Sequence, residues 1–335
     1  MRIASLFNNI AFPIIVEIGS NHEGNLDKAL ELVQLAYEAG AKIIKFQSYT
    51  PERFIAAHDM VRRERIKKFR LSEDNFEKIF EFTQKLGVQF LSTPVTEDWI
   101  DLLDPLCSVF KIASGDITFK PVIQKAARTG KPLLISTGAA TIEEIDQAVS
   151  WVEQEVGSQH IKERLILMHC VSAYPTPIEE ANILSIPFLK ARYGLRVGYS
   201  NHVIGMNACL AAVALGADVV EIHFTDCKEN REFRDHALSF DQKDLKTFIH
   251  ASNEIYKSLG QYRKEVQSCE SSSISMLRKG IIAARDIKNG EVISESDLMF
   301  ARPATEFSSQ EIHLLIGKKL KADVSKGYLN PRDAI

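Results

Sequence analysis

Short apolar runs rich in β-branched side chains recur along the first 225 residues. They occupy residues 13–19, 42–48, 88–94, 108–114, 132–138, 165–171, 195–201 and 218–224. Within each run the apolar positions follow one another instead of alternating with polar ones. This is typical of strands that are buried on both faces in a parallel sheet covered by helices. The pattern therefore predicts eight buried parallel strands.

Helical patterns fill the intervals between these strands. In residues 25–41, apolar side chains recur at i, i+3, i+4 and i+7, and Asn25 is a candidate N-cap. Residues 141–156 repeat the design, with Thr141 and Glu144 spaced as a capping box. Eight strands alternating with helices over about 250 residues favour an α/β fold of the (β/α)₈ TIM-barrel type. An open doubly wound sheet is the alternative that the count leaves open.

The pattern changes near residue 260. Residues 261–274 are polar and rich in serine, as in a linker. Residues 275–335 contain short strand-like segments and glycine-containing turns, which predicts a small β-rich domain near the lower size limit for independent folding. We therefore expect a barrel over residues 1–260, a linker over 261–274 and a second domain over 275–335.

Composition narrows the class of protein. The chain has 335 residues, 45% hydrophobic and 25% charged, and a net charge of −3, as in ordinary globular proteins. The basic run 61–70 is interpreted as a solvated helix face, so no nucleic-acid partner is expected. No run reaches the roughly 20 apolar residues of a membrane span, and no secretory signal is apparent, so we expect a cytoplasmic protein without a membrane partner. The five cysteines show no CxxC spacing and are expected to be reduced thiols.

Polar side chains gather at the C-terminal ends of the predicted strands, which face one mouth in a (β/α)₈ barrel. Lys45 and Lys111 are the most informative, because they interrupt otherwise apolar strands. Burying an unpaired ammonium costs several kcal/mol, so an anionic partner is expected. Together with strand-end hydroxyls, the two lysines could hold a phosphate and a carboxylate.

Two histidines end neighbouring strands. His202 and His223, with a carboxylate from Asp235 or Glu17, would suit a divalent transition metal. A hydrogen-bonded histidine pair without metal is the alternative. By contrast, His22 and Glu23 follow the first strand in a segment suited to a hydrogen-bonded turn, and we interpret them as structural.

Taken together, these segments resemble the sialic acid synthase family, whose enzymes condense phosphoenolpyruvate with an N-acylated hexosamine. The resemblance rests on "EIGSNHEG", "IIKFQS", "FLSTP", "FKIASGD", "ISTGAAT", "HCVSAYPTP", "GYSNH", "EIHFTD" and "DHALS". It continues through "GIIAARDIKNGEVISESDLMFARP", which is similar to the family's C-terminal antifreeze-like, or SAF, domain. The resemblance covers nearly the whole chain.

The resemblance implies roles for particular residues. His202 and His223 are expected to bind Mn²⁺ or Mg²⁺. The residues expected around phosphoenolpyruvate are Lys45, Thr93, Lys111, Ser114, Ser172, Ser200 and Asn201. Those expected to contact the amino sugar are Glu17, Gln47, Tyr174, Asp235 and Arg302, the last from the SAF domain of the partner subunit in a domain-swapped homodimer. The catalytic residues are expected to be Glu17, Asp116, Lys45 and Lys111.

Three positions depart from the family pattern. Ser172 stands where asparagine is usual, Asp116 stands where glutamate is common, and residues 229–235 replace a Gly-Pro-Asp-like loop. The first two concern the phosphoenolpyruvate and catalytic-water region. The third concerns the acceptor sugar.

The predicted activity is that of a phosphoenolpyruvate-condensing transferase, an N-acetylneuraminate synthase or a related nonulosonic acid synthase. It would join phosphoenolpyruvate to an N-acyl mannosamine-type sugar and release phosphate by C–O cleavage. A legionaminic or pseudaminic acid synthase acting on a 2,4-diacetamido hexose is the alternative. A keto-deoxy sugar phosphate synthase would need a third strand-end cation, which the sequence does not offer. The remaining alternatives are a class I aldolase using Lys45 or Lys111 and a carbohydrate-binding scaffold.

Overall fold

A computed structural model describes residues 7, 10–229, 231, 233–304, 306–328, 332 and 335. Its backbone divides into two compact units, Met1–Gly260 and Gln261–Ile335. In the first unit, eight parallel strands of the described chain close into a barrel in sequence order, which confirms the predicted (β/α)₈ fold. The strands are β1 (Ile14–Gly19), β2 (Ile43–Ser48), β3 (Gln89–Pro94), β4 (Phe110–Ile112), β5 (Leu133–Ser136), β6 (Leu165–His169), β7 (Arg196–Ser200) and β8 (Val220–His223).

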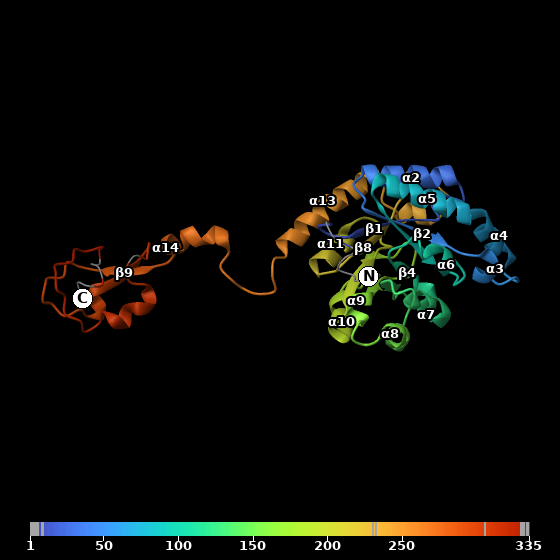
Figure 1. Cartoon of the computed structure of the whole chain (residues 1–335). Helices are drawn as coiled ribbons and strands as arrows, with labels where there is room; N and C mark the ends of the chain where they lie inside the picture. The colour runs from blue at the N-terminus through green and yellow to red at the C-terminus, as the bar shows by residue number, and fades with distance from the viewer. Residues whose placement is uncertain are drawn as a thin grey trace. The chain divides into compact units, whose positions relative to one another are not determined.

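Helices surround this barrel (Figure 1). They are α2 (Leu26–Glu38), α3 (Pro51–Phe54), α4 (Met60–Phe69), α5 (Glu73–Leu86), α6 (Trp99–Leu103), α7 (Lys120–Arg128), α8 (Ile142–Val156), α9 (Ile161–Arg164), α10 (Ser185–Tyr193), α11 (Asn207–Ala214), α12 (Asp235–Leu238) and α13 (Gln242–Ser258). Two predicted helix starts are confirmed. Asn25 accepts a hydrogen bond from the backbone N–H of Lys28, and Thr141 and Glu144 form the capping box of α8.

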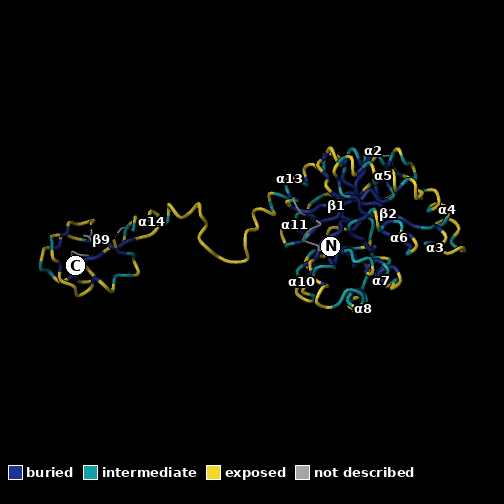
Figure 2. The backbone as a smooth tube through the Cα atoms, viewed as in Figure 1, coloured by how far each residue is buried: buried dark blue, intermediate teal, exposed yellow. Residues whose placement is uncertain are grey.

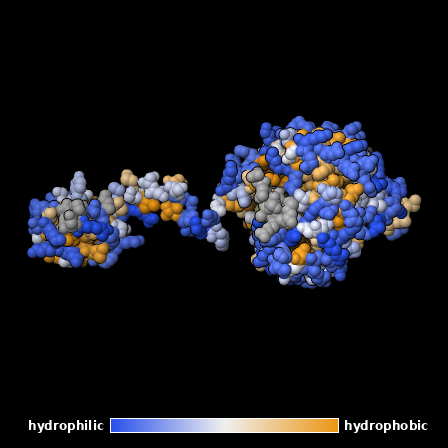
Figure 3. Space-filling model, in the orientation of Figure 1, coloured by the Kyte–Doolittle hydropathy of each residue, from blue (hydrophilic) through white to orange (hydrophobic). Residues whose placement is uncertain are grey.

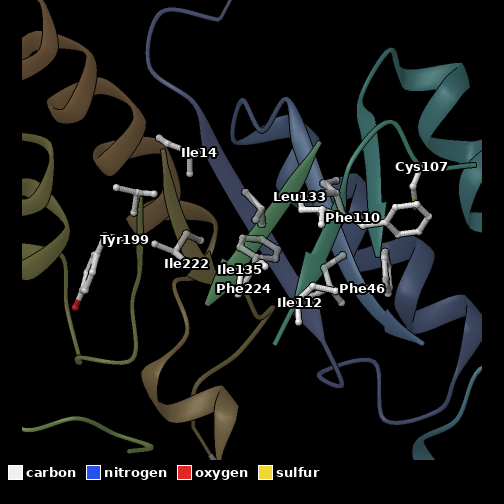
Figure 4. Close-up of a cluster of buried hydrophobic side chains, with 14 of the residues drawn as sticks. Ile14, Phe46, Cys107, Phe110, Ile112, Leu133, Ile135, Tyr199, Ile222 and Phe224 are labelled. Atoms are coloured by element: carbon white, nitrogen blue, oxygen red, sulfur yellow. The ribbon is translucent and has the colours of Figure 1, made fainter. Parts of the chain in front are cut away.

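The outer face of the barrel forms the larger hydrophobic core. Side chains that point outward from the strands, such as Phe46, Phe110 and Ile222, pack with the apolar faces of the helices (Figure 4). Accordingly, the strands are buried along their length, whereas the helices are exposed on their outer sides (Figure 2). Hydrophilic side chains cover most of the visible face of this unit (Figure 3).

The inner face of the barrel is layered. Its floor is a separate apolar cluster of Ile15, Ile43, Leu91, Val109, Leu134, Ile166, Met168 and Val219. Successive strand side chains point to opposite faces, so the next inward position lies two residues further on. Those positions hold Glu17, Lys45, Thr93, Lys111, Ser136 and Glu221. The inside of the barrel therefore changes from apolar to charged within one layer, toward the C-terminal ends of the strands.

The second unit is a small β-containing domain. Its strands β9 (Gly280–Ala283) and β10 (Leu298–Ala301) pair antiparallel, with Leu298 opposite Ala283. A short helix, α14 (Ile274–Leu277), precedes them. The core of this unit comprises Ile281, Ala283, Ile287, Ile293, Leu298, Phe307, Leu315, Leu320 and Val324. In the part of the chain that the structure describes, no helix is both long and apolar enough to cross a membrane.

Candidate active site

A cavity of about 1340 Å³ opens above the charged layer, at the C-terminal ends of the strands. Most of the predicted site residues of the first unit line it. They are Glu17, Lys45, Gln47, Thr93, Lys111, Ser114, Asp116, Ser172, Tyr174, Ser200, His202, His223 and Asp235. These side chains come from every strand-end region except that of β5, which adds Ser136. Arg302 lies in the second unit, directly after β10.

Two lysines and two glutamates form the charged layer. Nζ of Lys45 lies 2.8 Å from Oε2 of Glu17 and 3.7 Å from Oε1 of Glu221. The same Glu221 oxygen lies 3.8 Å from Nζ of Lys111. All four side chains are at most 5% exposed. The protein itself thus supplies anionic partners for both lysines, so their burial alone does not require an anionic ligand.

The two lysines are not equally satisfied. Burial opposes the charge on Lys45, but Glu17 and Glu221 outweigh it and raise the pKa of this lysine. For Lys111, burial outweighs the attraction of Glu221, Lys45 adds repulsion, and the pKa is lowered. The closest polar contact of Lys111 is a neutral one, a hydrogen bond of 2.6 Å to Oγ of Ser136. The positive charge of Lys111 is therefore less well compensated by the protein than that of Lys45.

Hydroxyl and amide groups fix the geometry of this layer. Lys45 donates to Oγ1 of Thr93 at 3.0 Å, and Gln47 donates to Oε1 of Glu17 at 2.8 Å. Ser200 donates to Oε1 of Glu221 at 3.1 Å. Each contact joins different strands. The charged side chains are consequently held in one arrangement by the barrel rather than by flexible loops.

The two histidines lie together beside this layer. The ring centroids of His202 and His223 are 5.4 Å apart. Nδ1 of His202 is 2.6 Å from the carbonyl oxygen of Val171. A carbonyl oxygen can only accept, so Nδ1 carries the proton and the lone pair of His202 is on Nε2. Burial, with a smaller contribution from His223, lowers the pKa of His202 to about 3, so this imidazole is neutral at pH 7.

The histidine pair has the donor chemistry of a metal site. Nδ1 of His223 is buried without a hydrogen-bond partner among the described residues, and Oδ2 of Asp235 lies 3.9 Å from it. A second nitrogen fixed by a backbone carbonyl, as in His202, is the usual outer support of a metal-binding imidazole. The described side chains bring no group of three His, Cys, Asp or Glu together as a metal cluster. An ion at the two imidazoles would therefore need its other ligands from water or substrate.

Asp116 lines the cavity from a short 3₁₀ turn, Ser114–Asp116, that follows β4. Burial raises the pKa of its carboxyl group to about 6, although Lys111 pulls in the other direction. A carboxyl group that titrates near neutral pH can accept and return a proton under working conditions. Asp116 is thus a candidate for proton transfer.

Tyr174 connects the histidine pair to the outer part of the cavity. Its ring centroid lies 4.1 Å from that of His202, and the guanidinium of Arg234 lies over the Tyr174 ring, 4.5 Å from the ring centroid. Asp235 follows as the first residue of α12. Within the divergent loop 229–235, residues 230 and 232 lie outside the described residues.

Some strand-end residues hold loops instead of lining the cavity. Asn21 donates to the carbonyl oxygen of Phe224 at 2.8 Å, and His22 accepts from the backbone N–H of Gly24 at 3.0 Å. Asn201, predicted at the phosphoenolpyruvate site, is not part of the cavity lining that the structure describes. Its amide bonds to Tyr199 and to both backbone groups of Val203. Its side chain therefore shapes the loop after β7.

The sequence interpretation missed Glu221, the central residue of the charged layer. Its signal was present: it stands two residues before His223 in an apolar strand, and so on the same face. It also missed the cationic face of α4. Arg62, Arg65 and Lys68 line the cavity, although the run 61–70 was interpreted as a solvated helix face.

The fold and the site define a barrel enzyme whose chemistry lies at the C-terminal ends of its strands. Comparison with known proteins identifies the family. The NeuB family model matches residues 32–264, and the SAF domain model matches residues 278–328. The chain belongs to the NeuB family, whose members include sialic, legionaminic and pseudaminic acid synthases.

Individual relatives agree with this assignment. An uncharacterised protein of Methanocaldococcus jannaschii is 41% identical, over 92% of this chain and 90% of its own length. The N,N'-diacetyllegionaminic acid synthase of Campylobacter jejuni is 35% identical, over 91% of this chain and 94% of its own. The crystal structure of N-acetylneuraminic acid synthetase from Leptospira borgpetersenii is 32% identical, with a TM-score of 0.74 over 80% of this chain and 93% of its own. These relatives show which family the chain belongs to and leave the choice of acceptor sugar open.

Proposed function

We propose that the protein condenses phosphoenolpyruvate with an N-acyl mannosamine-type sugar to form a nonulosonic acid and inorganic phosphate. The observation that carries the proposal is the Lys45, Lys111, Glu17 and Glu221 layer beside the His202 and His223 pair, in one cavity. Phosphoenolpyruvate carries about three negative charges near neutral pH, and such an anion is gathered by charge-assisted hydrogen bonds. A synthase acting on a 2,4-diacetamido hexose is the alternative within the same family.

Lys111 is the proposed anchor of phosphoenolpyruvate. Its lowered pKa reflects a charge that burial leaves poorly compensated, so an approaching phosphate or carboxylate would stabilise it. Ser136 offers a hydroxyl beside it, and Ser114 adds another to the same cavity. Gly138 packs directly against two serines, because a Cβ at this position would lie 2.4 Å from Oγ of Ser172 and 2.9 Å from Oγ of Ser114. Ser172, at the divergent position, thus belongs to the proposed phosphoenolpyruvate pocket.

His202 and His223 would hold a divalent ion through neutral imidazole nitrogens. Such an ion, when bound, would polarise the aldehyde group of the open-chain sugar. Glu17, held by Lys45 and Gln47, is proposed to bind the sugar hydroxyls. Tyr174 and Asp235 would contact the rest of the sugar.

The bonds change in a defined order. The π electrons between C2 and C3 of phosphoenolpyruvate form a bond from C3 to the aldehyde carbon, whose oxygen takes up a proton. Water then adds to the electron-poor C2, and Asp116 accepts the proton that this water loses, consistent with its pKa of about 6. The new C2 hydroxyl then loses its proton to the departing phosphate as the C2–O bond to phosphate breaks, so hydrogen phosphate leaves and C2 becomes a ketone. Holding both substrates in register lowers the barrier by several kcal/mol.

The test is a screen of acceptor sugars that measures phosphate release from phosphoenolpyruvate, with EDTA as the control. We expect release with one N-acyl hexosamine and loss of release with EDTA. Absence of turnover with every acceptor would contradict the proposal. The lowered pKa of Lys111 also suits a Schiff-base lysine, so borohydride trapping with pyruvate is included, and we expect no labelling.

A further inference from the structure

The helix α4 forms one wall of the cavity and carries an unusual set of charges. Arg62, Arg65 and Lys68 line the cavity at a spacing of i, i+3 and i+6, which keeps them on one side of the helix. None of the helix residues is buried, so α4 contributes little to the hydrophobic core. Its sequence therefore needs an explanation other than packing.

The cations of α4 separate into two groups by their partners. Arg63 and Lys67 do not line the cavity, and they pair with Glu52 at 3.5 Å and with Glu64 at 2.9 Å. For Arg62, Arg65 and Lys68, no carboxylate of the described residues lies within ion-pair distance. The cations that face outward are thus neutralised, whereas those that face the cavity are not.

Several contacts fix α4 against the cavity wall. Tyr49 donates a hydrogen bond of 3.2 Å to the carbonyl oxygen of Ile66. Gly24, with φ of +80°, lies so close to Lys68 that a Cβ on it would be 2.1 Å from the carbonyl oxygen of that lysine. The ring of Phe69 meets that of Phe233 edge to face, with centroids 5.2 Å apart. These contacts hold the cationic face toward the cavity.

The same contacts give the direction in which an acceptor would extend. Tyr174 contacts His202, Arg234 lies over Tyr174, and Phe233 next to Arg234 contacts Phe69 of α4. A sugar with its aldehyde carbon at the histidine pair would therefore extend its far end toward α4. Three cations and the lining carboxylate of Glu64 give this wall a net charge of about +2, which matches a phosphate dianion better than a neutral hydroxyl.

We infer that Arg62, Arg65 and Lys68 form a binding site for an anionic group on the end of the acceptor sugar that does not react. This inference rests on the proposed function and narrows its substrate class to acidic amino sugars. A phosphate ester and a uronic carboxylate share the required chemistry. Arginine side chains bind both groups through paired N–H donors, and a monodentate lysine adds charge.

The experiment compares N-acetylmannosamine, its 6-phosphate and its 6-carboxylate in the full-length enzyme, with phosphoenolpyruvate consumption as the readout. We expect kcat/KM for an anionic acceptor to exceed that for the neutral sugar by at least tenfold, and the better of the two anions identifies the group. Arg65→Ala should reduce this preference at least tenfold. Arg63→Ala removes a cation of the same helix that pairs with Glu52, and neither residue lines the cavity, so this variant should leave the preference at the wild-type value.

The measured quantity is the ratio of kcat/KM for the anionic acceptor to kcat/KM for the neutral one. If the α4 cations only attracted phosphoenolpyruvate, their removal would lower both values alike and leave the ratio unchanged. Equal use of neutral and anionic sugars, or equal loss of preference in Arg65→Ala and Arg63→Ala, would overturn the inference. Calorimetric binding of N-acetylmannosamine 6-phosphate separates it from the proposed function. If no sugar is turned over, the proposed function fails. Tighter binding of N-acetylmannosamine 6-phosphate to the wild type than to Arg65→Ala would still support the α4 site. Equal binding to both proteins would refute it.

Discussion

The charged layer predicts a large effect for one isosteric change, Glu221→Gln. Oε1 of Glu221 lies between the two lysines, at 3.7 Å from Lys45 and 3.8 Å from Lys111, and accepts a hydrogen bond from Ser200. Glutamine keeps the shape of the side chain and an oxygen for Ser200, but it removes the negative charge. A layer of two ammoniums and two carboxylates then becomes positively charged inside the barrel.

The magnitude follows from burial and distance. At these separations each pair interacts by about 4 kcal/mol at an effective dielectric constant of about 20. Lys45 keeps Glu17 at 2.8 Å, so the loss falls mainly on Lys111. Removing one partner of a buried ion pair usually costs about 3–5 kcal/mol, since the remaining charge is left uncompensated. We expect Glu221→Gln to lower the free energy of unfolding of the barrel at pH 7 by this amount.

Urea unfolding followed by tryptophan fluorescence measures this cost. Both tryptophans, Trp99 and Trp151, belong to the first unit, so the signal reports on the barrel. With a urea dependence of about 3 kcal/mol per molar, the midpoint should fall by about 1–2 M. Asp101→Asn is the matched control: Asp101 pairs with Lys125 at only 2.7 Å, but its side chain is 79% exposed. Exposed pairs contribute less than about 1 kcal/mol.

The pH dependence of the same effect has a defined sign. Burial disfavours the ionised Glu221, but Lys111 and Lys45 outweigh it and lower its pKa below that of the unfolded chain. The stability that Glu221 contributes is therefore present at pH 7 and is lost as the pH falls through its lowered pKa. The difference between wild type and Glu221→Gln should shrink in strong acid. A midpoint shift at pH 7 no larger than that of Asp101→Asn would refute the reasoning.

Three further variants test single roles in catalysis. His223→Ala should reduce metal-stimulated turnover to the level measured with EDTA, and normal stimulation would contradict its role as a ligand. Arg302→Ala should raise the KM for the acceptor several-fold while the thermal unfolding of the barrel is unchanged; an unaltered KM would exclude a contact with the sugar. In the wild type, kcat/KM should rise as the pH passes through about 6, where Asp116 ionises, and Asp116→Asn should remove this limb and lower kcat by about 10²–10⁴. Persistence of the limb in Asp116→Asn would assign the proton transfer to another group.

The barrel could be predicted from the sequence because its signals are local. Uninterrupted apolar runs and capped helices between them require only neighbouring residues, and the closed sheet follows the predicted order of strands. The inward positions were accessible for the same reason. Ile43 and Lys45 lie two residues apart on one strand and therefore point to the same face. The sequence of that strand alone thus predicts an apolar floor and a charged layer above it.

The partners of the charged residues could not be predicted, because they come from distant parts of the chain. Lys45 reads in the sequence as a buried cation in need of an anion, yet Glu17 and Glu221 supply that charge from β1 and β8. Asn201 is of a residue type that often binds ligands, but its amide forms hydrogen bonds with Tyr199 and Val203 close by in the chain. A charged side chain lacks a partner only in the context of the folded structure. The spacing of residues along the chain does not show which side chains these are.

The ion pairs in the structure also change which cations indicate a ligand: those on α4 do so more strongly than the lysines inside the barrel. The lysines in the barrel are buried, which makes them conspicuous in the sequence, but Glu17 and Glu221 already lie within ion-pair distance of them. The cations on α4 are exposed and looked ordinary, but they face a cavity without a described carboxylate partner while their neighbours on the same helix are paired. An incoming anion must compete with Glu17 and Glu221 at the inner layer, whereas it meets no such competitor at Arg65. Discrimination between acceptors is therefore expected to arise at the outer wall, and the inner layer is expected to set the chemistry that all acceptors share.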